Sequence, residues 1–184
     1  MDAFALWLTG LPASGKTTLA NLLAEELDRR GLRVQVLDSD KMRKILTPEP
    51  TYSAEERDWF YETLAYIGKL LVQNGVNTII AATAHRLEYR QRAREYLPEY
   101  IEVYVRCSID TCMERDQKGI YKKALGSKDM HVPGVQELYE EPKAPAIIVD
   151  NEESSPLECV QKILAHLEHF GRIQNESGLL SNNE

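Results

Sequence analysis

Residues 10–17 of this chain read GLPASGKT, and this stretch decides the fold. It satisfies the pattern G-x-x-x-x-G-K-[ST], whose glycines let the backbone wrap closely round phosphate groups. An apolar run at residues 3–9 precedes it, and leucines at helical spacing follow it. A buried strand, a glycine-rich turn and a helix, in that order, are the setting in which this pattern holds the phosphates of a nucleotide.

The spacing also gives each position of this phosphate loop a chemical role. Backbone N–H groups and the positive end of the following helix attract the phosphates. We expect Lys16 to reach the β- and γ-phosphates of ATP and the Thr17 hydroxyl to bind Mg²⁺. The candidate ATP-binding residues are those of the loop and the first helical turn: Gly10, Ala13, Ser14, Gly15, Lys16, Thr17 and Thr18.

Beyond the loop, strand-like and helix-like segments alternate. Short apolar runs predict strands at 34–37, 76–82, 101–105 and 146–149, and the stretches between and after them predict helices at 41–46, 53–74, 88–96, 108–116 and 156–170. This alternation predicts an α/β fold, a P-loop NTPase or nucleoside-monophosphate-kinase-like three-layer sandwich with a central parallel sheet of about five strands. We expect a single domain at 1–172 and a flexible C-terminal tail at 173–184.

One long segment, 117–142, fits neither a strand nor a helix pattern. It is polar and basic, and it holds three glycines. A structureless segment of this length in a compact domain is usually functional. We therefore expect a mobile lid at about 117–142.

Composition excludes several classes of function. The 184 residues carry a formal net charge of −7, which argues against a nucleic-acid partner. No apolar run approaches the length of a membrane span. Three cysteines without a C-x-x-C pair indicate reduced thiols, so we expect a cytoplasmic protein.

Two acids follow the second predicted strand. Asp38 and Asp40 stand where ligands bind in such folds, at the carboxyl end of a strand, whereas the third strand is followed by no acid. We expect both to be catalytic with Lys16. One would orient the acceptor hydroxyl, and the other, for which we take Asp40, would hold magnesium with Thr17, directly or through water. A merely acidic turn is the alternative reading, because Asp and Ser favour turns.

Several motifs together resemble those of the adenylylsulfate kinases, which phosphorylate the 3′-hydroxyl of adenosine 5′-phosphosulfate. GLPASGKT resembles the phosphate loop of that family, and LDSDKMR at 37–43 resembles its L-D-G-D-x-x-R. Tyr52, Ser53 and Arg57 resemble its F-S-x-x-x-R, with Tyr in place of Phe. ERDQKGIYKKA at 114–124 and GVQELYEEP at 134–142 match two further motifs, so the resemblance covers nearly the whole chain.

This resemblance implies roles for residues outside the phosphate loop. Arg115 would clamp ATP, and the lid would close over the site. The family often forms dimers, which implies a possible homodimer whose ligands are small-molecule nucleotides. The residues implied or proposed to meet the acceptor are Asp38, Arg43, Tyr52, Arg57, Phe60, His85, Arg86, Lys122 and Val132.

The sequence departs from the family mainly on the acceptor side. Phe60 replaces an Asn, TAHRL at 83–87 replaces I-S-P-Y-R, and Val132 replaces an aromatic. His85 and Arg86 could supply replacement contacts to an anionic acceptor. Two alternatives stay open: a kinase of the same architecture that acts on another nucleotide derivative or hydroxyl metabolite, and a nucleotide-binding regulator without turnover.

Overall fold

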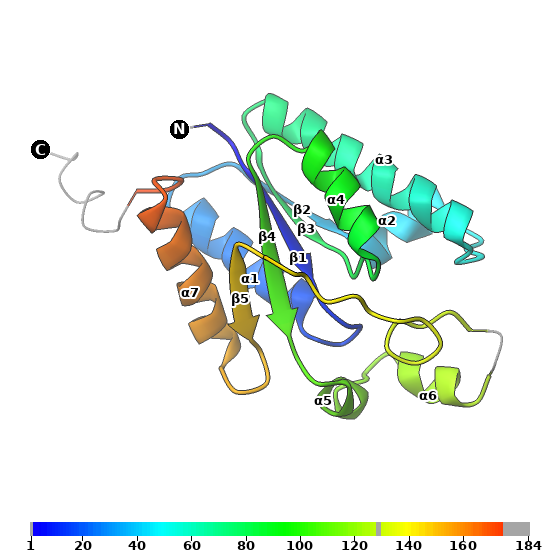
Figure 1. Ribbon diagram of the computed structural model, residues 1–184. Coiled ribbons are helices and arrows are strands. Elements are labelled where there is room, and N and C mark those ends of the chain that lie inside the picture. The colour runs from blue at the N-terminus through cyan, green and yellow to red at the C-terminus, as the bar shows by residue number, and fades with distance from the viewer. Residues whose placement is uncertain (1, 128–129, 175–184) are drawn as a thin grey trace, which may run out of the picture.

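The computed structural model describes residues 2–127 and 130–174, and its centre is a parallel sheet (Figure 1). The strands are β1 (Ala5–Thr9), β2 (Val34–Asp38), β3 (Asn77–Ala81), β4 (Tyr100–Arg106) and β5 (Ile147–Asp150). They lie in the order β2-β3-β1-β4-β5, and every pairing is parallel. The predicted α/β fold with five strands is confirmed.

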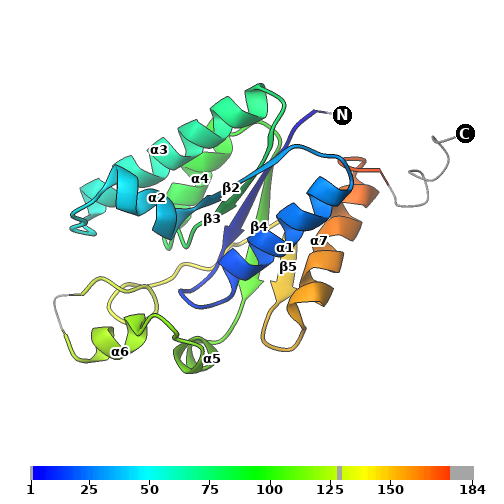
Figure 2. The same ribbon diagram turned by 180° about the vertical axis from the view of Figure 1, so that it is seen from behind.

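Helices cover both faces of this sheet. They are α1 (Lys16–Arg29), α2 (Ser39–Leu46), α3 (Ala54–Gln73), α4 (Leu87–Tyr96), α5 (Ile109–Glu114), α6 (Ile120–Leu125) and α7 (Pro156–His169). Helix α1 packs against α7 on one face, and α3 packs against α2 and α4 on the other (Figures 1 and 2). The three layers that the alternation predicts are therefore present.

Strand β1 shows why its sequence is apolar throughout. All five of its residues are buried, because both faces of the central strand are covered. Leu6 and Leu8 belong to the cluster under α1 and α7, whereas Ala5 and Trp7 belong to the cluster under α3 and α4. The carboxyl end of β1 leads directly into the phosphate loop.

The segment 117–142 has more structure than its sequence suggests, and the expectation of a structureless stretch is wrong. It contains α6 and takes part in a third apolar cluster with the start of α5. Tyr121 and Val132 are buried there with Cys107 and Cys112, whose neutral thiols pack as apolar groups since burial raises their pKa. The apolar residues of the segment are too widely spaced to show a period, so only the tertiary contacts reveal the cluster.

The chain end differs from expectation at one residue, and the start of α3 has a specific cap. Ser53 caps α3 by accepting a hydrogen bond from the Glu56 backbone, while the Glu56 carboxylate binds Thr51 and Arg43. Ile173, at the start of the expected tail, is buried in the core beside α7. Residues 175–184 of that tail lie outside the described residues. Among the helices of the described ranges, none combines the length and the apolar character needed to cross a membrane.

Candidate active site at the phosphate loop

The phosphate loop has a backbone that only glycine satisfies at two positions. Gly10 and Gly15 both have positive φ angles, 155° and 96°. A Cβ atom on Gly10 would overlap the Val105 carbonyl, and one on Gly15 would overlap the Asn151 side chain. The loop is thus held between β4 and the end of β5, and larger residues at 10 or 15 would displace it.

Lys16 lies over its own loop. Its ammonium donates hydrogen bonds to the carbonyls of Gly10 (3.0 Å) and Leu11 (2.7 Å). Burial lowers the pKa of Lys16 to about 8, although the carboxylates of Asp40 and Asp38 raise it. A mostly protonated ammonium at the centre of the loop is the group that an incoming phosphate requires.

The two candidate acids occupy different environments. Asp38 is buried at the N-cap of α2, where Oδ1 accepts hydrogen bonds from the backbones of Asp40 and Lys41. Its other oxygen accepts a 2.6 Å hydrogen bond from the Thr17 hydroxyl. Asp40 is exposed on the first turn of α2 and pairs with Lys118 of the segment 117–142. The structure thus brings Asp38, and not Asp40, to Thr17.

Arg115 and Asn151 support the loop from the side of β4 and β5. Arg115 follows α5, is exposed, and donates to the carbonyl of Asn151 at 2.7 Å. Asn151 is buried directly after β5, and its amide donates to the Ser14 carbonyl at 2.8 Å. Asn151 is not among the site residues expected from the sequence, although it follows a predicted strand, as Asp38 does.

Two arginines lie beside the exposed ring of Tyr52. The Arg43 guanidinium lies 5.0 Å from the Tyr52 ring centre, and its Nη1 atom donates to Glu56 at 2.6 Å. Arg57 donates from Nε to the Tyr52 carbonyl at 2.9 Å. Tyr52 itself has a positive φ of 56°, a strained backbone of the kind that clusters at ligand sites.

Comparison with known proteins identifies the family. The adenylylsulphate kinase family model matches residues 2–150. The chain belongs to the adenylylsulfate kinase family. It is 40% identical over 167 residues to an adenylyl-sulfate kinase of Thermodesulfovibrio yellowstonii, covering 90% of this chain and 84% of the relative. It is 37% identical to a probable bifunctional SAT/APS kinase 2 of Sorangium cellulosum, of which it covers only 30%.

A solved structure agrees in fold as well. The Mycobacterium tuberculosis APS kinase CysC in complex with AMPPNP and APS superposes with a TM-score of 0.86 at 28% identity. The match covers 91% of this chain and 98% of that one. The likeness therefore spans most of the chain.

Two residues at positions where this chain departs from the family motifs are buried. Phe60 is fully buried in the cluster under α3, and the Arg43 guanidinium covers its ring at 3.8 Å. Val132 is buried in the third apolar cluster. Phe60 supports Arg43 in this structure, and Val132 packs the segment 117–142 against the body.

The other candidate acceptor residues include both buried and exposed side chains. His85 is 1% exposed and its ring faces Arg57, with 2.9 Å between His85 Nδ1 and Arg57 Nη1. Arg86 is exposed and lies over Tyr89, while Lys122 is exposed on α6. Thr18 is also exposed, one residue past the magnesium candidate Thr17. Among the candidate acceptor residues, Arg43, Tyr52, Arg57 and His85 form a connected group, with Phe60 beneath Arg43.

Residues 139–141, which we call the strap, fasten the end of the segment 117–142 to the body. The Tyr139 hydroxyl lies 3.0 Å from the Thr9 hydroxyl, and Glu140 accepts a hydrogen bond from the Leu87 backbone at 2.6 Å. The Glu140 backbone donates to the His85 carbonyl at 2.8 Å. Arg90 of α4 then joins the Glu140 carbonyl to the Ala84 carbonyl.

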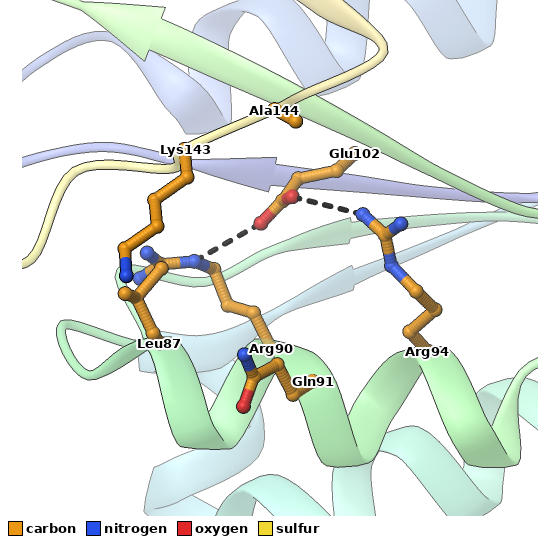
Figure 3. A pocket seen from close by; sticks show the side chains of 7 residues that line it. All are labelled: Leu87, Arg90, Gln91, Arg94, Glu102, Lys143 and Ala144. Carbon is orange, nitrogen blue, oxygen red and sulfur yellow. Dashed lines mark hydrogen bonds and ion pairs between the residues drawn. The ribbon is translucent and has the colours of Figure 1, made fainter.

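A cavity of about 320 Å³ lies behind this strap, away from the phosphate loop. Figure 3 shows Arg90 and Arg94 both directed toward Glu102, with Lys143 at the edge. The Arg90 Nε atom lies 3.0 Å from Glu102, which is buried in β4. Since one acid already pairs with both arginines, this cavity belongs to the anchoring of the strap and not to the site of ATP.

The hydroxyl oxygen of Thr17 and the carboxylate oxygen of Asp38 fit magnesium. No cluster of three or more His, Cys, Asp or Glu side chains that could hold a metal occurs within residues 2–127 and 130–174. Magnesium prefers oxygen ligands and takes one or two protein groups together with phosphate oxygens and water. A threonine hydroxyl and a buried carboxylate 2.6 Å apart meet that requirement.

Proposed function

We propose that this chain transfers the γ-phosphoryl group of ATP to the 3′-hydroxyl of adenosine 5′-phosphosulfate and so produces its 3′-phosphorylated form. The observation that carries the proposal is the family match over residues 2–150, which contains an intact phosphate loop with its lysine, threonine and acids. A regulator without turnover would be expected to have lost Lys16 or the acids, and all are present.

Catalysis in such a site consists mainly of positioning and charge neutralisation. The backbone N–H groups of the loop and Lys16 hold the β- and γ-phosphates. Lys16 leaves the carbonyls of Gly10 and Leu11 to do so, exchanging neutral acceptors for charged ones. We place Arg115 on the ATP side, since it already packs on the loop after β5.

The two acids divide the remaining work. Thr17 and Asp38 would hold magnesium, which neutralises charge that develops on the transferred phosphoryl group. We assign the acceptor hydroxyl to Asp40, because its carboxylate is exposed, raises the pKa of Lys16 through its charge, and pairs with Lys118. Asp40 would accept or orient the proton of that hydroxyl as the bond to phosphorus forms.

The segment 117–142 acts as the lid in this proposal. Lys118 joins it to α2, Tyr121 joins it to the loop through the Pro12 carbonyl, and the strap joins it to β1 and α4. Closure would exclude water, which competes with the acceptor for the phosphoryl group. The exposed residues Arg86, Lys122 and Thr18 would take a secondary part in ligand contact.

A different hydroxyl acceptor is the second candidate function. The observation that favours it is the burial of Phe60 and Val132, which leaves Tyr52 as the exposed ring beside Arg43 and Arg57. A base held on one face by Tyr52 loses about 1 kcal/mol compared with a base held on both faces. The acceptor's anionic groups, bound by the arginines, would then carry more of the specificity.

ADP release with Mg-ATP, measured with and without adenosine 5′-phosphosulfate, tests the proposal. We expect stimulation at micromolar acceptor together with the appearance of the 3′-phosphorylated product. Intact ATP binding without stimulation would contradict the proposed acceptor and favour another hydroxyl compound.

The proposal also covers the oligomeric state and the cellular compartment of the protein. We propose a homodimer that pairs the exposed side chains of Trp59, Tyr66 and Leu70, which lie along one stripe of α3. Light scattering of the purified chain tests this, and a monomer at micromolar concentration would contradict it. The three cysteines are free and buried, as we expect for a protein of the cytoplasm.

A further inference from the structure

Four residues from three parts of the chain form a closed ring next to Tyr52, and one link of the ring is to a backbone carbonyl. Arg57 belongs to α3, His85 to the loop after β3, and His131 and Glu137 to the segment 117–142. Arg57 lies 2.9 Å from His85 Nδ1 and also donates to the His131 carbonyl. His131 Nδ1 lies 2.9 Å from one Glu137 oxygen, and His85 Nε2 lies 3.8 Å from the other.

The direction of these contacts determines the protonation of His85. A guanidinium has no acceptor, so His85 Nδ1 must accept the hydrogen bond from Arg57. The remaining proton of the neutral ring is then on Nε2, the atom that faces Glu137. Burial, reinforced by the nearby Arg57 cation, lowers the pKa of His85 to about 4, which keeps the ring neutral under ordinary conditions.

These contacts leave Arg57 with part of its donor capacity unused. A guanidinium has five N–H groups, and three of them serve Tyr52, His85 and His131. The described residues provide no hydrogen-bond acceptor for the other two. Arg57 is therefore held in one orientation by neutral partners while it keeps its full charge and two donors for an anion.

The buried His85 side chain lowers the stability of the fold, whereas an apolar side chain at position 85 would carry no unpaired polar atom. His85 is 1% exposed, and its Nε2 atom has no hydrogen-bond partner at normal distance. A buried donor without a partner is destabilising. Such a residue, at a position where the family motif has proline, indicates a functional reason for its presence.

We propose that His85 is a positioning residue for the phosphoryl acceptor: it orients Arg57 toward an anionic group of that nucleotide and couples Arg57 to the segment 117–142 through Glu137. This rests on the proposed function. His85 does not contact the acceptor itself, because its ring lies between Arg57 and Glu137 and is shielded from solvent.

Steady-state kinetics of three His85 variants test the proposal. His85→Leu removes the acceptor for Arg57, and we expect the KM for adenosine 5′-phosphosulfate to rise about ten- to a hundredfold. The KM for ATP and the kcat at saturating acceptor should change less than about twofold, since Lys16 and its loop are untouched. His85→Asn places an amide oxygen near the Nδ1 position and should restore the acceptor KM to within about threefold of wild type. His85→Gln lacks that oxygen and should behave as His85→Leu does.

Two further variants separate the ring from general packing. Glu137→Leu should raise the acceptor KM severalfold, because the link from Arg57 to the segment 117–142 is lost. His166→Leu on α7 replaces a partly buried histidine whose ring contacts Phe170, and it should leave both KM values unchanged. An unchanged acceptor KM in His85→Leu, or equal KM values in His85→Asn and His85→Leu, would overturn the proposal.

Nitrogen NMR of the histidine rings gives a readout that does not depend on activity. In the wild-type chain at pH 6.5, His85 should be neutral with its proton on Nε2. A doubly protonated imidazole, or a proton on Nδ1, would contradict the hydrogen bond from Arg57 to His85 and so overturn the closed ring of contacts. If the wild-type chain fails to phosphorylate adenosine 5′-phosphosulfate while the NMR result is as expected, the proposed function fails and the Arg57–His85 contact stands.

Discussion

Asn151 offers the sharpest test of how the fold shapes the phosphate loop. Its amide Nδ2 donates to the Ser14 carbonyl at 2.8 Å, and both residues are buried. In Asn151→Ala the Ser14 carbonyl loses this partner in a place that water does not readily reach. We expect a loop that is less well ordered before ATP binds.

The cost follows from the burial of that carbonyl. A buried acceptor left without a hydrogen bond costs about 1–3 kcal/mol. If that free energy appears in nucleotide binding, the Kd for ATP rises about five- to 150-fold. Asn151→Asp should be worse than Asn151→Ala, because a carboxylate oxygen would face the carbonyl oxygen and a buried charge would lack a partner.

Calorimetric titration with Mg-ATP measures Kd, and urea unfolding measures the free energy of unfolding. Asn77→Ala is the matched control: Asn77 is equally buried and donates from its amide to the Arg33 carbonyl at 3.1 Å, but it lies at the start of β3. It should lower the stability and leave the ATP Kd within about twofold. An Asn151→Asp variant that binds ATP as tightly as wild type would refute the reasoning.

Three further predictions follow from the same geometry. Lys16→Ala should lower kcat at least about a hundredfold, because the charge on the phosphates loses its central partner. The circular dichroism spectrum should stay that of a folded chain. A smaller loss of kcat would contradict a catalytic role for Lys16. Asp40→Asn should lower kcat by about 10²–10⁴ with little change in the ATP KM, and a near wild-type kcat would contradict the assignment of the acceptor hydroxyl to Asp40. His85 has its pKa lowered from 6.5 to about 4, so the unfolded chain binds a proton there that the folded chain does not. The free energy of unfolding should therefore fall as the pH drops from 6.5 to 4, by up to about 3 kcal/mol for this group. Urea unfolding of His85→Asn should lack this part of the pH dependence. Parallel pH profiles of the wild type and His85→Asn would contradict the prediction.

The sequence by itself determined the phosphate loop, the parallel sheet and the position of the acids. These features have local patterns: the loop spans eight residues, β1 is apolar because both its faces are covered, and Asp38 follows a strand whose end is readable. The motif at 114–124 also marked the start of the segment that we expect to act as a lid. Such features are legible because the signal and the structure occupy the same short stretch of chain.

Tertiary structure decided which side chains share a site. Asp38 rather than Asp40 meets Thr17, because α2 begins at once and the N-cap turns the Asp38 side chain toward α1. His85 is a partner of Arg57 instead of an exposed contact, since the strap covers it.

Asn151 illustrates the reason most directly. The amide that supports Ser14 comes from 137 positions later in the chain. A hydrogen bond over that separation depends on the order of the strands, which places the end of β5 beside the loop after β1 by way of β4. No pattern within a window of a few residues encodes such a meeting, so only the folded chain reveals it.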